Sequence, residues 1–122
     1  MSKNNNSQGK ISEAQAAVFL ESRGYQILFR NYKAQGAEID IIAREKDTIC
    51  FIEVKSRSSD RFGSPQEAVT SAKQQKISRA ASMFLQENDL QDRSCRFDVV
   101  GIIRRQGREE FSLIRDAFIS SE

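Results

Sequence analysis

The sequence predicts an α/β fold, in which a mixed β-sheet of about five strands is flanked by helices in the order α-β-β-β-α-β-β. Three observations lead to this prediction. Five short segments are rich in β-branched and aromatic residues. Two longer segments repeat their apolar residues at helical spacing. The second of these helices lies between the third and fourth strands, where it can act as a crossover and place those two strands parallel.

The first helix is predicted over residues 12–23. Ser12 and Gln15 have the spacing of a capping box at its start, and Gly24 is a typical residue just past a helix end. Residues 1–10 are rich in Asn, Ser and Lys, and we expect them to form a disordered tail.

Three strands are predicted after this helix, over residues 25–32 (YQILFRNY), 38–43 (EIDIIA) and 48–55 (TICFIEVK). The third is the most apolar, so we expect it at the centre of the sheet. Residues 44–47 should form the turn before it. Residues 56–64 are polar and contain glycine, which predicts a loop.

The second helix is predicted to begin at Ser64. Pro65 is then the first helical residue and Glu67 closes a capping box. Apolar residues recur at helical intervals from there to about Gln86, where we expect the helix to end.

The last two strands are predicted over residues 97–103 and 110–114, joined by a charged turn around residues 106–107. No internal repeat or linker divides the chain. At 122 residues it is long enough for one hydrophobic core, so we expect a single domain over residues 11–122.

Composition excludes several classes of protein. No apolar segment approaches the ~20 residues of a membrane span, and the N-terminus has no apolar signal core, so we expect a cytoplasmic protein with no membrane partner. The chain has no histidine, which excludes histidine-based nucleases, hydrolase triads and ordinary zinc sites. Cys50 and Cys95 lie among apolar neighbours and are predicted to be buried thiols. The net charge of +2 does not by itself predict a nucleic-acid partner.

The most specific feature is a pair of segments, residues 36–40 (GAEID) and 52–55 (IEVK). Glu53 and Lys55 are two residues apart, so on a strand they point to one face, roughly 7 Å apart. The twelve residues 41–52 separate Asp40 from Glu53 and suit a hairpin that brings the two carboxylates together.

These residue types are those required by metal-dependent phosphodiester hydrolysis. Asp40 and Glu53 would bind a divalent cation, and the Val54 carbonyl could add a third oxygen ligand. Oxygen ligands favour Mg²⁺ or Mn²⁺. A cation held in this way neutralises charge on the transition state, and Lys55 could orient or deprotonate the attacking water.

Each acid also has a simpler interpretation. Glu53 and Lys55 could form a surface ion pair, although the apolar strand around them and the nearby Asp40 argue against it. If the strand is regular, Glu38 shares a face with Asp40, and it could be a further ligand, a supporting acid behind the ligands, or a solvated residue at the strand start. Glu13 lies in the first turn of a helix, where the helix dipole favours an acid regardless of function. For Asp98 we favour a salt bridge with Arg96 or Arg93 over catalysis.

Basic residues follow the candidate site. Arg57 and Arg61 lie in the polar loop, and Lys73 and Lys76 lie in the second helix. These side chains could track a phosphate backbone. The alternative is a solvated charged face, and the position next to the acidic site favours nucleic-acid binding.

Several segments together identify the chain as resembling the YraN family of small bacterial proteins. They are GAEIDIIA (36–43), FIEVKSR (51–57), RFGSPQEAV (61–69), Lys73 and RFDVV (96–100). The resemblance runs from the first helix through the fourth strand. One departure is Ala37, where the family usually has Gly; here Gly36 stands one residue earlier, which concerns the loop backbone and not the acids.

The resemblance implies a restriction-endonuclease-like, nuclease-like domain with an Asp…Glu-x-Lys site, similar to archaeal Holliday-junction resolvases. By this resemblance Asp40, Glu53 and Lys55 are the catalytic set, and Glu13 matches an extra acid of such resolvases. The expected function is that of a Mg²⁺- or Mn²⁺-dependent endonuclease that hydrolyses DNA, with branched or Holliday-junction DNA as a candidate substrate. Symmetric cutting of two strands would require a homodimer. The alternative is a non-catalytic DNA-binding or recombination-accessory module that keeps the fold.

Overall fold

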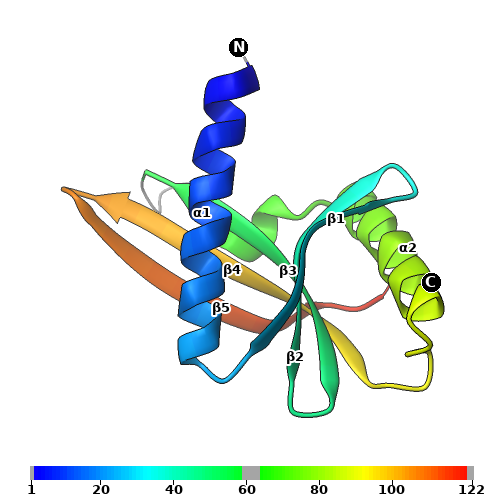
Figure 1. Cartoon of the computed structure of the whole chain (residues 1–122). Helices are drawn as coiled ribbons and strands as arrows, with labels where there is room; N and C mark the ends of the chain where they lie inside the picture. Colours follow the sequence, from blue (N-terminus) through cyan, green and yellow to red (C-terminus); the bar gives the residue numbers. More distant parts are fainter. Residues whose placement is uncertain (1, 59–63, 121–122) are drawn as a thin grey trace.

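The computed structural model describes residues 2–58 and 64–120, with side chains described from residue 9 onwards. The chain forms a five-stranded mixed sheet with one long helix packed on each face (Figure 1). In chain order the elements are α1 (Ser2–Ser22), β1 (Gln26–Ala34), β2 (Ala37–Glu45), β3 (Thr48–Arg57), η1 (Pro65–Ala68), α2 (Ser71–Glu87), β4 (Cys95–Arg105) and β5 (Arg108–Phe118). This arrangement confirms the predicted fold class.

The strands lie in the sheet in the same order as in the chain. β3 and β4 pair in parallel, and the other neighbouring strands pair antiparallel. β3 is therefore central, as predicted, and the segment that contains α2 is the crossover between the two parallel strands. In the described part of the chain, no helix is both long enough and apolar enough to cross a membrane.

Apolar side chains cover both faces of the sheet. On β3, Ile49 and Phe51 pack toward α2, whereas Cys50 and Ile52 pack toward α1. This alternation explains why the sequence of β3 is a continuous apolar run: both sides of the strand are buried. Leu20, which is fully buried, fixes the C-terminal half of α1 to its face of the sheet.

Helix α1 ends as predicted but begins earlier. Tyr25 N–H donates to the Leu20 carbonyl (3.1 Å), and Gly24 takes the left-handed conformation (φ +94°) that this type of helix end requires. The predicted start at Ser12 is wrong, because α1 begins at Ser2 and includes most of the segment predicted to be a disordered tail. That segment contains no proline, and a formed helix extends at low cost because each added residue gains a hydrogen bond.

The second predicted helix is divided into η1 and α2. Its predicted start is right, since Ser64 N–H donates to the Glu67 carboxylate (3.2 Å). Val69 then takes an extended conformation (φ −93°, ψ 92°) and is buried in the core between the sheet and α2. Thr70 starts a new helix, and its side-chain oxygen accepts a hydrogen bond from Lys73 N–H (3.3 Å). The burial of Val69 therefore outweighs the continuous helical pattern.

Two other local predictions are wrong. Cys95 is exposed, because it is the first residue of β4, whereas Cys50 is buried as predicted. The strands also extend beyond their apolar centres. For example, β5 runs from Arg108 to Phe118, although only residues 110–114 carry a recognisable strand pattern. Strand residues at an exposed sheet edge are polar, so their sequence does not distinguish them from a loop.

Gly101 allows η1 to pack closely on the sheet. It pairs with Lys55 across the β3–β4 ladder, and a Cβ at this position would overlap Pro65 Cγ and lie 2.7 Å from Ser112 Oγ. We expect Gly101→Ala to lower the free energy of unfolding by about 1–3 kcal/mol, because neither a proline ring nor a strand backbone can move aside freely. Urea denaturation measures this change.

Gly9→Ala is the matched control for this prediction. Gly9 lies in α1, and a Cβ built there has no atom within 4 Å outside its chain neighbours and the backbone of the helix itself, so alanine should not destabilise the protein. Equal stability of the two variants would contradict the close packing of Pro65 on Gly101.

Candidate active site

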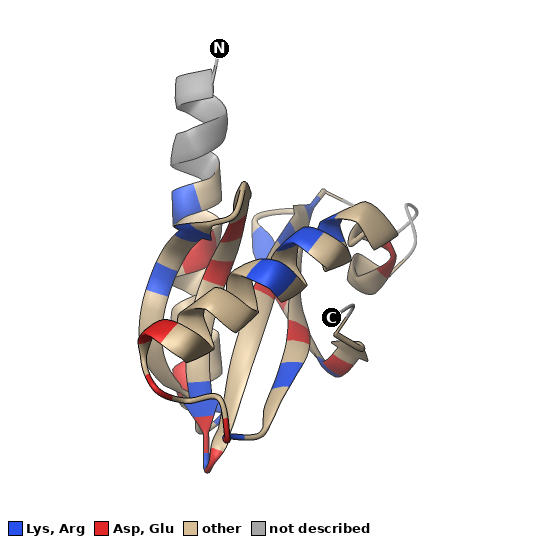
Figure 2. Ribbon diagram, turned by 90° about the vertical axis from the view of Figure 1, so that its right-hand side faces the viewer, with Lys and Arg blue, Asp and Glu red and all other residues tan. Residues whose placement is uncertain are grey.

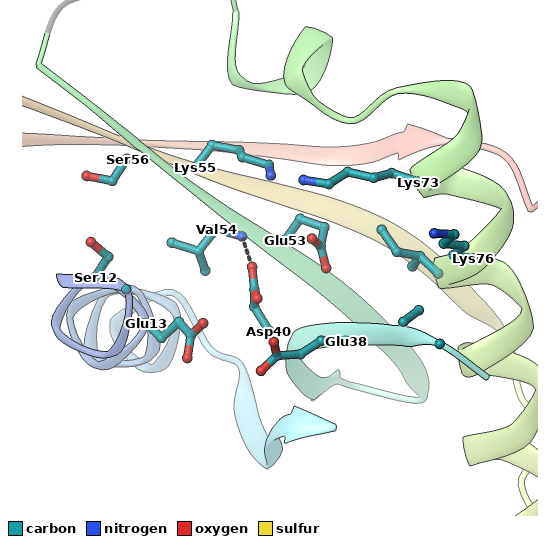
Figure 3. Close-up of a pocket in the computed structure, with 14 residues that line it drawn as sticks. Ser12, Glu13, Glu38, Asp40, Glu53, Val54, Lys55, Ser56, Lys73 and Lys76 are labelled. Carbon is teal, nitrogen blue, oxygen red and sulfur yellow. Dashed lines mark hydrogen bonds between the residues drawn. The ribbon is translucent and has the colours of Figure 1, made fainter. Parts of the chain in front are cut away.

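A pocket of about 520 Å³ lies where β2 and β3 separate, between α1 on one side and α2 on the other (Figure 3). The β2–β3 ladder ends at the pair Ile41 and Ile52. Beyond that pair β2 stays with β1, and β3 stays with β4. The predicted hairpin thus places Asp40 and Glu53 one residue past the last pair, on the two sides of the opening.

The Asp40 side chain bridges this opening. Its Oδ2 accepts a hydrogen bond from Val54 N–H (2.8 Å), so a carboxylate takes the place of a backbone carbonyl where the ladder has ended. Burial raises the pKa of Asp40, and the bond from Val54 and the charge of Lys55 oppose that rise. One carboxylate oxygen is held in this way, which fixes the direction in which the other points.

An irregularity in β1 and β2 turns Asp40 toward β3. Ile39 packs on the α2 face and Ile41 on the α1 face, although residues two apart on a regular strand share one face. On β1, Asn31 lies opposite this position, between the pairs formed by Arg30 and Tyr32, and has a left-handed conformation (φ +58°). Asn tolerates this conformation better than most residues.

Glu53 lies on the floor of the pocket and is 5% exposed. Its Oε2 is buried and has no hydrogen-bond partner among the described residues. Burial, followed by the charge of Asp40, raises the pKa of Glu53 to about 8. A buried carboxylate oxygen without a partner is costly, and a bound cation would satisfy it.

Glu13 and Glu38 complete the acidic wall of the pocket (Figure 3). Glu13 reaches in from α1, and burial followed by the charge of Asp40 raises its pKa to about 7. Its Oε1 is also buried without a hydrogen-bond partner in the described part of the chain. Glu38 comes from the start of β2 and lines the pocket beside Asp40 (Figure 3).

The arrangement of the acids suits an ion such as Mg²⁺, which keeps several water ligands, better than an ion that is coordinated by protein side chains alone. Among the described residues, no three Asp, Glu, Cys or His side chains converge closely enough to hold an ion by themselves. Mg²⁺ commonly takes one or two carboxylates and completes its octahedron with water. Asp40 and Glu53 would supply the two carboxylates, and the Val54 carbonyl stays a predicted third ligand.

The opposite wall of the pocket is basic. Lys55 from β3 and Lys73 from α2 extend toward each other across Glu53, and Lys76 lies one turn further along α2 (Figure 3). Burial lowers the pKa of Lys55, and the neighbouring Lys73 lowers it further, whereas Glu53 and Asp40 oppose the change. Basic residues recur along α2 on this side of the molecule (Figure 2). The pocket therefore lies between an acidic and a basic wall.

The remaining predicted residues lie elsewhere. Arg57 ends β3, does not line the pocket, and has a buried Nε without a hydrogen-bond partner in residues 2–58 and 64–120. Arg61 lies outside the described residues. Asp98 is fully buried and accepts hydrogen bonds from Arg96 Nε (3.0 Å) and Tyr25 Oη (3.0 Å). The predicted pairing of Asp98 with Arg96 is confirmed.

Sequence reasoning missed two contributions to the site. Asn31 is not a strand former, and an Asn within an apolar strand is a readable signal of a left-handed residue. Lys73 is predicted as a nucleic-acid contact from its charge, but its approach to Lys55 depends on where Thr70 starts α2. The sequence pattern does not predict a helix start at Thr70, because the apolar residues keep their helical spacing from before Thr70 to after it.

Comparison with known proteins gives one family. The model of the uncharacterised protein family UPF0102 matches residues 12–102. A UPF0102 protein of Syntrophus aciditrophicus is 48% identical over 110 residues, which cover 90% of this chain and 87% of the relative. One of Acetivibrio thermocellus is 46% identical over 121 residues, covering 94% and 93%. One of Geobacter metallireducens is 44% identical over 118 residues, covering 97% of each chain.

The match spans every acidic and basic residue of the pocket, from Glu13 on α1 to Lys76 on α2. It also extends into β4, as far as Ile102, and β4 is the strand that pairs with the catalytic candidates on β3. These findings confirm the family predicted from the motifs: the chain belongs to the UPF0102 family, the YraN family of small proteins.

Proposed function

We propose that this protein is a Mg²⁺- or Mn²⁺-dependent endonuclease that hydrolyses DNA phosphodiesters. The observation that carries the proposal is the convergence of Asp40, Glu53 and Lys55 in one pocket, where a buried oxygen of Glu53 has no hydrogen-bond partner in the described structure. Metal-assisted hydrolysis requires carboxylates to hold the ion and a group to handle the water. The two carboxylates and the amine that lie where β2 and β3 separate are groups of these kinds.

Asp40 and Glu53 would hold the ion. When bound, it supplies positive charge to the phosphoryl oxygens and acidifies a coordinated water. Asp40 is already oriented by Val54 N–H, so little rearrangement is needed before binding. Lys55 would position the attacking water and accept its proton as the water oxygen bonds to phosphorus. The bond between phosphorus and one sugar oxygen would then break, and that oxygen would take a proton from solvent water. A depressed Lys55 pKa suits that role, because only the neutral amine can accept a proton.

The basic wall would bind the DNA backbone. Lys73 and Lys76 face the acids across the pocket, so a phosphate between the walls would meet cations on both sides once the metal is present. Arg57, at the end of β3, and Arg61, in the segment that follows it, stay predicted contacts to neighbouring phosphates. Resolution of a four-way junction would in addition require two sites in a homodimer.

The direct test is cleavage of labelled linear, flapped and four-way DNA in Mg²⁺, in Mn²⁺ and in EDTA. We expect cleavage with either metal and none in EDTA. DNA binding without cleavage in both metals would favour the non-catalytic accessory module instead. The same comparison identifies which DNA shape is preferred.

Asp40→Asn is expected to weaken Mn²⁺ binding at least tenfold in calorimetry, because the amide keeps the shape but not the charge of the ligand. Asp47→Asn is the matched control, since Asp47 is exposed in the β2–β3 turn, away from the pocket. Equal Mn²⁺ affinity in the Asp40 and Asp47 variants would remove Asp40 from the site.

A further inference from the structure

A second hollow of about 730 Å³ adjoins the candidate active site. The two hollows share Gly9, Glu13 and Glu38, and the two glutamate side chains form the wall between them. On the far side of that wall the second hollow is bordered by β1 and by the part of α1 around Lys10. We call this second hollow the flanking groove. A strand of DNA that crosses the active site would pass directly into it.

The floor of the flanking groove presents an aromatic ring. Phe29 lines the groove and is 48% exposed, and it is the one aromatic among the large exposed apolar side chains of the described residues. Tyr32 (ring centroids 5.7 Å apart) and Phe84 (6.5 Å) contact its ring in edge geometry. Tyr32 is in turn fixed by a hydrogen bond from its hydroxyl to Glu87 on α2 (2.7 Å). The ring is thus firmly held but only partly covered.

The rim of the groove carries positive charge. Lys10 and Lys33 line it from α1 and β1, and both are exposed. Within the described part of the chain, neither lysine forms a salt bridge. An exposed aromatic beside unpaired cations is the combination that binds a nucleotide: the base stacks on the ring, and the phosphate meets the ammonium groups.

We propose that the flanking groove binds the nucleotide next to the cleaved phosphodiester, with its base stacked on Phe29 and its phosphate at Lys10 and Lys33. This inference rests on the proposed nuclease function, from which it takes the position of the scissile bond. A base can reach the ring only when it is unpaired. The groove therefore assigns the substrate class: DNA with an unpaired base beside the cut, as in a flap or an open branch point, in preference to continuous duplex.

The acidic wall fits this assignment. Glu13 and Glu38 repel phosphates from the centre of the shared wall, so a backbone that crosses it must be bound on both sides, at Lys73 and Lys76 in the active site and at Lys10 and Lys33 in the groove. A DNA strand that binds both phosphate sites must bend around the acids between them, so the arrangement favours DNA that bends sharply. Unpaired DNA bends in this way far more easily than duplex does.

The test uses a flap DNA with 2-aminopurine in its unpaired arm and a fully paired duplex of the same length, both in EDTA so that no cleavage occurs. Binding of the wild-type protein should quench the 2-aminopurine, and the flap should bind more tightly than the duplex. Phe29→Ala should abolish the quenching and weaken flap binding roughly 5- to 150-fold, the range for loss of one stacked base. Phe29→Tyr should retain both.

Leu28→Ala is the matched control, since Leu28 is 38% exposed beside Phe29 but does not line the groove. Lys33→Ala, which leaves the aromatic contacts intact, should reduce the salt dependence of flap binding by about one phosphate contact. Equal flap affinity in the Phe29 and Leu28 variants, or equal wild-type affinity for flap and duplex, would overturn the groove assignment.

The result is separable from that of the cleavage test. Metal-dependent cleavage with no effect of Phe29→Ala on binding or quenching would retain the nuclease and reject the groove. Phe29-dependent quenching in a protein that cleaves no DNA would reject the nuclease and retain the groove as a nucleotide site. Absence of binding to any DNA would reject both.

Discussion

Lys55→Ala is expected to slow DNA cleavage by roughly 10²–10⁴-fold, the usual contribution of a group that positions or deprotonates the attacking water. Metal and DNA binding should change little, because Asp40, Glu53 and Lys73 all remain. Single-turnover cleavage rates and fluorescence anisotropy separate the two effects. The distinction matters because a lysine beside Glu53 and Asp40 can also act as a charge partner alone.

Lys46→Asn provides the control for removal of a lysine. Lys46 is exposed in the β2–β3 turn with φ +55°, a conformation that Asn accepts, so cleavage should equal that of the wild type. If Lys55 only balanced the charge of Glu53, its loss would lower the melting temperature, and cleavage would fall only in proportion to the folded fraction. That outcome would rule out a direct role in the reaction.

Glu53→Gln should have opposite effects on stability and on metal binding. In the absence of metal, we expect the variant to be about 1–3 kcal/mol more stable at pH 8.5, because a neutral amide is less costly to bury than a carboxylate with an unpartnered oxygen. Mn²⁺ binding and cleavage should both be lost. Urea denaturation in EDTA and calorimetry measure the two effects, with Glu21→Gln, on the exposed surface of α1, as control.

The same carboxyl predicts a pH dependence. Burial raises the pKa of Glu53 from 4.5 to about 8, so between these values the folded protein holds a proton that the unfolded chain has released. The free energy of unfolding of the metal-free protein should therefore fall as pH rises through this window. In Glu53→Gln the fall should be smaller. The remainder comes from Glu13, whose pKa of about 7 defines a narrower window, and from Asp40, whose pKa is also raised by burial. A wild-type protein that becomes more stable from pH 5 to pH 8 would contradict this assignment.

The core of the site could be predicted from the sequence because its parts are local. Asp40 and Glu53 face each other across one hairpin, so the spacing between them and the apolar pattern around them determine that they meet. Glu53 and Lys55 share a face through strand alternation alone. The parallel pairing of β3 with β4 likewise follows from a helix placed between them.

The parts that could not be predicted depend on tertiary packing. Val69 interrupts a continuous helical pattern because its side chain is buried against the sheet, and this break determines where Lys73 points. The left-handed Asn31 and the change of face at Asp40 are irregularities of paired strands, which no single-strand pattern contains. The flanking groove combines α1 with β1, and its existence depends on how the helix lies over the sheet.

The early end of the β2–β3 ladder has a consequence for when the candidate active site can assemble during synthesis. Past Ile52, the backbone of β3 pairs only with β4, from Glu53 opposite Val99 to Arg57 opposite Ile103. All the pocket residues have left the ribosome before β4 has emerged, yet the segment that carries Glu53 and Lys55 has no neighbouring strand until then. A parallel partner across a long crossover is also among the slowest contacts to form. The nascent chain therefore contains all the pocket residues before they are held together, and the pocket would be complete only when β4, with β5 beside it, pairs with β3.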